Sequence, residues 1–439
     1  MTALELRALM TAAILHPVTF LLAVNIVCAA LGLAQFAYSI AVLKPTDFAI
    51  IGVLAALAGV VTGLIDVKLG DLTSKLYFAI PKEKRTERAA QLSASLALHV
   101  AVGLVATCLI TLAGALLAPR LLEQPVERWW LGALAVRIGL GYPLAAFYLF
   151  PRLVGDFRAA GRGRLAGQTL ATLLTIAVLI STPSLDGYFA GSLLGAAVST
   201  LIALVMSSRC SERALAATIL RAPPVAAVRA HLGSVTFLAS TWLLGAARVL
   251  TNACDTLLVA ALTTDTTAGL YRIARQAYDS LAALTDAVHQ FYTPTIVECL
   301  SRDRWQDFNK HRRRLLIMGA IVTSGTLLLS REVLRPLARA SYPQYSAALP
   351  AFDVFAGLFL LTISIHGWLW PMLVASNQVS LMSVLALAGG VAQLTAMWAL
   401  GSAGLLDPTT AAATSWLALV LAYGPMLVLG RSLRNKPRQ

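Results

Sequence analysis

Long apolar runs separated by short polar breaks dominate this sequence. The run over 91–117, for example, is longer than a helix or strand of a soluble core requires. Only 13% of the 439 residues are charged and 58% are hydrophobic, whereas about a quarter of a typical soluble domain is charged. So few charges cannot cover the surface of a soluble fold while that much apolar area is buried. We therefore expect an all-α polytopic membrane protein.

Twelve of these runs reach or approach the roughly 20 residues that a helix needs to cross the hydrocarbon core of a bilayer. Prolines, polar clusters and charged breaks separate one run from the next. The predicted transmembrane helices are 14–40, 47–78, 91–117, 129–151, 165–182, 187–206, 234–262, 268–296, 315–336, 347–374, 379–400 and 409–430.

Basic residues alternate between the connections that these helices leave. With a cytoplasmic N-terminus, the cytoplasmic segments carry 23 lysines and arginines and the opposite segments carry six. The positive-inside rule then predicts an inner-membrane protein with both termini in the cytoplasm. Orientation and attraction to anionic membrane lipids explain the net charge of +14. Because no nucleic-acid module is recognisable, we expect no nucleic-acid partner.

The longest polar connection, 207–233, divides the chain near its middle and carries Pro223, Pro224 and four arginines. A faint repeat supports two related halves. VLKPTDFAIIG (42–52) leads into a helix with GLID, and ALTTDTTAGLY (261–271) leads into a helix with ALTD. The predicted organisation is an N-terminal six-helix bundle, a cytoplasmic linker, a C-terminal six-helix bundle and a basic tail, over 1–206, 207–233, 234–430 and 431–439.

Sequence signatures of chemistry are missing. The chain has no GxxxxGK[ST], GxSxG or HExxH motif and no paired-cysteine spacing, and its six histidines are scattered. We therefore expect no enzyme, no cofactor and no metal. A membrane glycosyltransferase or polymerase is disfavoured because the predicted outer loops are short. Transport is the favoured class of function.

Charged residues inside the predicted helices cost on the order of 3 kcal/mol each at the bilayer centre, so they need a partner or a watery cavity. Helical spacing places those of 268–296 on one stripe and Arg248 and Asp255 on one face of 234–262. The residues singled out are Arg137, Arg248, Arg272, Arg275, Asp66, Lys68, Asp255, Asp279 and Asp286.

Two interpretations of these charges stay open. They could pair with one another and lock the helices together, or they could line a cavity. We favour the cavity for Arg248, Arg272 and Arg275, because three arginines with few carboxylates leave a site that accepts an anion. Guanidinium suits phosphate because its planar fork binds two oxygens. The aspartates would hold the arginines without ligand or titrate as ion-coupling groups, and Asp66 and Lys68 belong to the same set of pairing groups.

Three stretches resemble a known family. LGLAQFAYSIAVLKPTDFAIIGVLAAL (31–57) resembles the opening helix pair of Wzx-type polysaccharide and oligosaccharide flippases. NACDTLLVAALTTDTTAGLYRIARQAYDSL (252–281) resembles the start of their second half, and SYPQYSAALPAF (341–352) is a third similarity. Those flippases belong to the multidrug/oligosaccharidyl-lipid/polysaccharide (MOP) superfamily, which has twelve or more helices in two bundles around a central cavity.

The resemblance implies a flippase that carries undecaprenyl-pyrophosphate-linked oligosaccharide repeat units from the inner to the outer leaflet for surface polysaccharide or exopolysaccharide biosynthesis. Its implied partners are the lipid-linked oligosaccharide, membrane lipids and a polysaccharide polymerase complex. The family's cationic cavity would correspond to Arg137, Arg248, Arg272 and Arg275. Related lipid II flippases carry an arginine in the first helix, where this chain offers only Asn25 and Gln35. That departure favours a surface-polysaccharide repeat unit over lipid II.

A multidrug or organic-cation antiporter of the same superfamily is the alternative. A cation site needs net negative charge and aromatic faces, whereas the stripe on 268–296 is balanced to positive. The charge pattern therefore favours the flippase.

Overall fold

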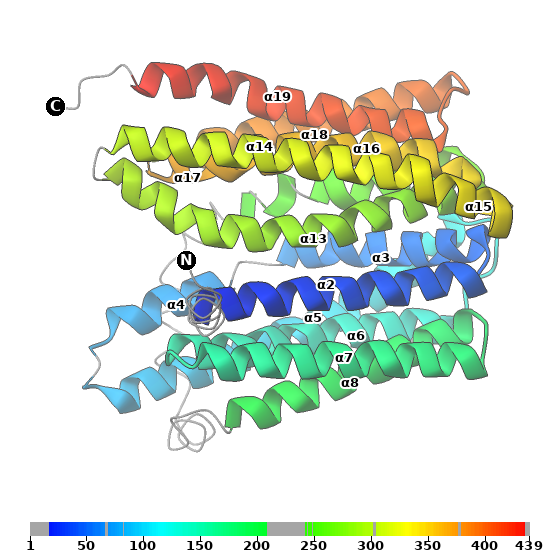
Figure 1. The fold of residues 1–439 in the computed structure, drawn as a ribbon. Helices are drawn as coiled ribbons and strands as arrows, with labels where there is room; N and C mark the ends of the chain where they lie inside the picture. Colours follow the sequence, from blue (N-terminus) through cyan, green and yellow to red (C-terminus); the bar gives the residue numbers. More distant parts are fainter. Residues whose placement is uncertain are drawn as a thin grey trace, which may run out of the picture. The chain divides into compact units, whose positions relative to one another are not determined.

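The structure is a computed structural model that describes residues 17–65, 69–81, 83–208, 242–243, 245–247, 249–301, 304–375 and 379–434. Every regular element within these ranges is a helix (Figure 1). The prediction of an all-α membrane fold is confirmed. Ten helices of the described residues are long and apolar enough to cross a membrane, and about twelve in two bundles agrees with the fold.

Contacts divide the chain into two compact units. The first contains the described parts of Met1–Val42, Ile65–Ala115 and Glu127–Trp242, and the second those of Leu43–Leu64, Leu116–Val126 and Leu243–Gln439. The linker predicted at 207–233 lies, after Ser208, outside the described residues. A division of the chain at that linker therefore stays a prediction.

The first unit is a bundle in which α7 packs against both α8 and α2, and α6 packs against α7 and α8. Small and aromatic side chains such as Phe189 and Ala135 are fully or almost fully buried in it. Its helices are α2 (Pro17–Val42), α4 (Leu69–Ala79), most of α5 (Arg85–Leu121), α6 (Arg128–Leu153), α7 (Phe157–Ser181) and α8 (Leu185–Ser208).

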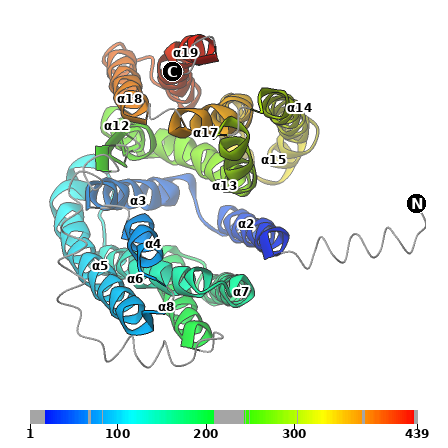
Figure 2. The same ribbon diagram turned by 90° about the vertical axis from the view of Figure 1, so that its left-hand side faces the viewer.

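In the second unit, α14, α16 and α19 run side by side, with α13 packed against all three (Figure 1). Figure 2 views these helices close to end-on, with α18 beside α19. The elements are α3 (Pro45–Ile65), η1 (Leu250–Cys254), α12 (Asp255–Leu262), α13 (Asp265–Ser301), α14 (Trp305–Leu329), η2 (Ser330–Leu334), α15 (Arg335–Ser341), η3 (Pro343–Ala348), α16 (Leu349–Leu361), η4 (Thr362–His366), α17 (Gly367–Ala375), α18 (Val379–Ser402) and α19 (Pro408–Arg434).

Large apolar side chains cover the outside of both units. Leu104 and Ile180 are each 64% exposed in the first unit, and Ile321 is 65% exposed in the second. In water such surface would drive aggregation, whereas in a bilayer it faces lipid at no cost. The exposed apolar surface therefore supports the membrane assignment independently of helix length.

Several predicted helices differ in detail from the structure, and two serve as examples. The prediction ran one helix over 47–78, but α3 ends at Ile65, α4 begins at Leu69, and 66–68 lie outside the described residues. The helix predicted over 347–374 contains the π turn η4 between α16 and α17. α13 is long enough to span a bilayer, but it is absent from the ten apolar helices because polar and charged side chains interrupt it.

The starts of α3 and α13, which carry the faint sequence repeat, lie directly against each other. A Cβ added at Gly269 would clash with the backbone carbonyl of Pro45, and a Cβ added at Gly52 would lie 2.7 Å from Cγ of Arg272. Glycine allows both close approaches because it has no side chain. This contact explains why 43–64 groups with the second unit although it comes early in the sequence.

Candidate functional site

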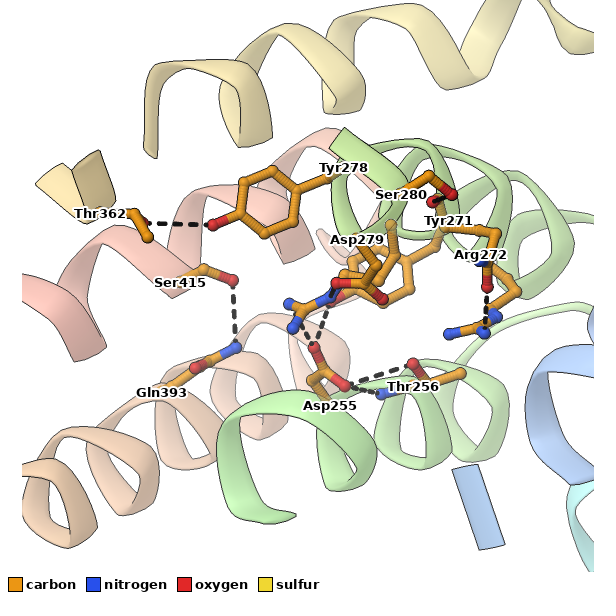
Figure 3. A network of polar contacts seen from close by, with 12 residues as sticks. Asp255, Thr256, Tyr271, Arg272, Tyr278, Asp279, Ser280, Thr362, Gln393 and Ser415 are labelled. Atoms are coloured by element: carbon orange, nitrogen blue, oxygen red, sulfur yellow. Dashed lines mark hydrogen bonds and ion pairs between the residues drawn. The ribbon is translucent and has the colours of Figure 1, made fainter. Parts of the chain in front are cut away.

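The second unit contains a fully buried carboxylate, Asp255, directly after the π turn η1. Its Oδ1 accepts hydrogen bonds from the backbone N–H of Thr256 at 2.6 Å and from Thr256 Oγ1 at 3.2 Å. Its Oδ2 accepts from Tyr271 Oη at 2.7 Å and from Arg275 Nη1 at 3.2 Å (Figure 3). Every partner of this carboxylate is a donor, which is what a buried anion requires.

Helical periodicity on α13 builds the other side of the cluster. Tyr271, Arg275 and Asp279 are spaced by four residues, so their side chains lie one above another on one face. Arg275 Nε donates to Asp279 Oδ1 at 3.2 Å, while its Nη1 reaches Asp255. The Arg275 side chain is only 6% exposed, whereas that of Asp279 is 40% exposed. The arginine is therefore held between one buried and one accessible carboxylate.

Aromatic rings cover the faces of the same guanidinium. Its carbon lies 5.3 Å from the ring centroid of Phe355 and 5.7 Å from that of Tyr278. Tyr278 stacks on Phe355 at 5.5 Å, and Tyr271 packs against the same ring at 5.7 Å. Cation–π attraction adds to the two ion pairs when the site is dry. With two carboxylates and one guanidinium, the cluster carries a formal charge of minus one.

Arg275 and Tyr278 also line a cavity of about 170 Å³ within the second unit. Its wall is polar at three places. Tyr278 Oη and Thr362 Oγ1 lie 3.4 Å apart, Gln393 Nε2 donates to Ser415 Oγ at 3.2 Å, and Tyr423 Oη lies 2.9 Å from His366 Nδ1. Two of the three π turns in the described residues border it, through Thr251 of η1 and Thr362 and His366 of η4. Such turns occur frequently at functional sites.

Size decides what this cavity can hold. A water molecule takes about 30 Å³ in the liquid, so the cavity has room for a few waters or a small ion. Ligand pockets for drug-sized molecules run from about 300 Å³ upward, and an oligosaccharide diphosphate is larger still. The cavity beside the ion-pair cluster is therefore too small for a lipid-linked sugar.

The structure brings together three of the sequence-predicted residues, Asp255, Arg275 and Asp279. Arg272 lies beside them on α13 but donates through Nη2 to Gln276 Oε1 at 2.5 Å (Figure 3). Arg137 is exposed on α6 of the first unit. Arg248, Asp66, Lys68 and the side chain of Asp286 lie outside the described residues.

Sequence reasoning missed the polar lining that α16 to α19 contribute. Gln393 is fully buried, and its Oε1 has no hydrogen-bond partner. The sequence does show an amide inside the apolar run 379–400. It was overlooked because only charged residues inside the helices were singled out. Among the described residues, no group of three or more histidine, cysteine or acidic side chains is arranged to hold a metal ion.

Comparison with known proteins identifies the fold through solved structures. No family model and no curated protein matches the sequence. The fold matches an inward-facing multidrug resistance MATE family transporter of the MOP superfamily, with a TM-score of 0.70 and 12% identity over 95% of this chain and 100% of that one. It matches the lipid II flippase MurJ in an inward closed conformation, with a TM-score of 0.68 and 13% identity over 95% of this chain and 88% of that one.

A third match is an outward-facing MATE family transporter, with a TM-score of 0.53 and 14% identity over 95% of this chain and 94% of that one. Identities this low establish likeness of fold alone. The chain therefore has the fold of MOP-superfamily transporters, as the sequence resemblance implied, and its structural neighbours include both a flippase and multidrug transporters.

Proposed function

We propose that this chain is a flippase that moves undecaprenyl-pyrophosphate-linked oligosaccharide repeat units from the inner to the outer leaflet of the cytoplasmic membrane. The observation that carries the proposal is the fold it shares with a lipid II flippase over 95% of its length. The resemblance of 31–57 and 252–281 to Wzx-type flippases supports the oligosaccharide branch. Asn25 and Gln35, in place of a first-helix arginine, favour a surface-polysaccharide unit over lipid II.

The proposed mechanism is alternating access, with arginines that bind the diphosphate while the lipid tail stays in the bilayer. Moving an anion outward is favoured by the membrane potential, by about 2.3 kcal/mol per charge per 100 mV. A diphosphate with about two charges would gain on the order of 4–5 kcal/mol. Both termini are proposed to be cytoplasmic, and the polymerase complex stays a predicted partner.

We propose different roles for the four arginines. Arg275 already bonds to two carboxylates, so an anion that approached it would be repelled by both of them. Asp279 is the accessible partner, and its protonation or displacement would free Arg275 Nε. We therefore propose Arg137, Arg248 and Arg272 as direct contacts of the diphosphate and Asp279 as an ion-coupling group. Asp255 and Asp286, with Asp66 and Lys68, are proposed as pairing groups.

A multidrug or organic-cation antiporter remains the second candidate because one observation favours it. The described cluster of Asp255, Asp279 and Arg275 is net negative and is bordered by aromatic rings, which are the features that attract an organic cation. The MATE transporter with a TM-score of 0.70 shares the fold. Against it, the net negative charge is confined to one cluster that its own arginine largely neutralises.

Lipid extraction from a strain that lacks the gene tests the proposal. Mass analysis of undecaprenyl-linked glycans should show a complete repeat unit that accumulates while surface polysaccharide is lost. The wild-type gene should restore export, and so should Arg331→Ala, a control at a residue whose side chain is 81% exposed. Arg272→Ala should not. Unchanged lipid-linked glycans together with raised sensitivity to cationic drugs would contradict the flippase and favour the antiporter.

A further inference from the structure

Two half-buried arginines lie close to the connection between α6 and α7 in the first unit. Arg152 lies in the last turn of α6, and Arg164 lies two turns into α7. Gly155 has a φ of +87°, a conformation that favours glycine, and so reverses the chain between the helices. Asp156 Oδ1 accepts from the backbone N–H of Ala159 at 2.9 Å and caps α7. This built turn fixes where both arginines lie.

Neither guanidinium is neutralised by a described residue. No hydrogen bond or ion pair joins Arg152 or Arg164 to any part of the chain that the structure describes, and Arg152 Nε is buried without a partner. The two arginines are close enough to repel each other electrostatically. The one carboxylate in the connection, Asp156, is used as the helix cap. Half-buried like charges raise each other's energy in a low-dielectric setting. An anion bound between them would relieve this repulsion, so the arrangement favours anion binding.

Other hydrogen-bonding groups lie on α6 and α2 of the same unit. Tyr148 lies one turn before Arg152 on α6, and its Oη lies 2.9 Å from the position of a Cβ added at Gly167 of α7. Arg164 is within electrostatic reach of both Tyr148 and Cys28. One turn before Cys28 on α2, the Oδ1 of Asn25 is buried without a partner. The side-chain amide of Asn25 can offer either its oxygen as an acceptor or its NH₂ group as a donor, because its orientation is assigned from the hydrogen-bond network.

The two guanidinium groups alone can donate six or more hydrogen bonds to an oxyanion. Guanidinium binds phosphate bidentately. We infer that Arg152 and Arg164 form a binding site for a lipid-borne phosphate at the α6–α7 end of the first unit. Two lipids carry that chemistry, the diphosphate of a polyprenyl-linked cargo and the phosphodiester of an anionic phospholipid. Assignment to the cargo rests on the proposed flippase function, whereas the site itself does not.

The test measures binding to the purified full-length protein in detergent. Native mass spectrometry with undecaprenyl diphosphate or phosphatidylglycerol as the probe compares wild type with Arg152→Gln and Arg164→Gln. Each variant should lower affinity about tenfold, as expected for the loss of a charge-assisted hydrogen bond. Arg162→Gln, at an exposed position of the same helix, is the matched control and should bind like wild type. Equal affinity of all four proteins for both probes would overturn the site.

A second measurement separates binding from folding. Without phosphate, Arg152→Gln should melt no lower than wild type, because it removes like-charge repulsion. Inorganic pyrophosphate should raise the melting temperature of wild type but not of this variant, and an equal rise in both would overturn the site. Tighter binding of undecaprenyl diphosphate than of phosphatidylglycerol assigns the site to cargo. If wild type binds the two probes equally and both variants lose this binding, the site binds membrane lipid. The glycan profile of the deletion strain then tests the flippase proposal separately.

Discussion

Arg275 and Asp255 form a buried ion pair that joins α13 to the start of α12, with Nη1 and Oδ2 3.2 Å apart and side chains 6% and 0% exposed. Neither group could stand alone in this position, because an unpaired buried charge costs several kcal/mol. The same arginine bonds to Asp279, which is 40% exposed. One side of the cluster is thus locked inside the bundle, and the other side is accessible.

The first prediction concerns the buried carboxylate. Asp255→Asn removes a charge that accepts bonds from Arg275, Tyr271 and Thr256, and it should lower the stability of the protein by about 3 kcal/mol. Thermal unfolding in detergent measures the loss. Asp307→Asn breaks an exposed pair with Arg304, 3.7 Å apart, and should cost well under about 1 kcal/mol. Equal losses in the two variants would show that Asp255 is not a structural anchor.

A second prediction follows from the coupling of the pair. Arg275→Gln alone leaves Asp255 buried without its cation, and Asp255→Asn alone leaves Arg275 with one carboxylate. The double variant removes both charges, so its loss of stability should be smaller than the sum of the two single losses, by about 1 kcal/mol or more. A double-mutant cycle from melting temperatures measures this difference. Strict additivity would mean that the two side chains do not interact in the folded protein.

The third prediction tests the contact between the repeated segments. Gly269→Ala places a Cβ against the backbone carbonyl of Pro45, which cannot rotate away as a side chain could. We expect a large loss of folded protein, measured as the monodisperse fraction after purification. Gly132→Ala is the control, because nothing lies within 4 Å of the added Cβ, and alanine is the better helix former. If both variants behave like wild type, α3 and α13 do not approach as described.

The helices and the charged stripe were accessible from sequence because both depend on local spacing. A run of about 20 apolar residues is a membrane span whatever surrounds it, and four-residue spacing places Arg275 and Asp279 together on α13. The sequence also indicated Asp255 as a residue that would hold an arginine, but it did not show that Arg275 is the arginine it meets. A π turn at Leu250–Cys254 precedes Asp255 and changes the angle per residue, so a regular 3.6-residue spacing alone does not fix which face Asp255 occupies.

Packing between residues far apart in the chain could not be predicted from the sequence either. The contact of Gly269 with Pro45 joins residues more than two hundred positions apart, and only a weak repeat indicated it. The polar lining of the cavity, with Gln393 and Ser415 bonded between α18 and α19, comes from uncharged residues. Single amides and hydroxyls are common in apolar helices, because a hydroxyl can bond to the carbonyl one turn back. Their presence alone does not mark a site.

The last prediction separates the two carboxylates that hold Arg275. Asp279→Asn leaves the buried pair with Asp255 intact, so it should cost far less stability than Asp255→Asn, about 1 kcal/mol or less for a side chain that is 40% exposed. If Asp279 is the coupling group, the same variant should nevertheless reduce export, and complete repeat units should accumulate on the lipid carrier of cells that express it at normal level. Asp307→Asn is the matched control at an exposed pair. Normal export with Asp279→Asn would rule out a coupling role and leave Asp279 as an ordinary ion-pair partner of Arg275.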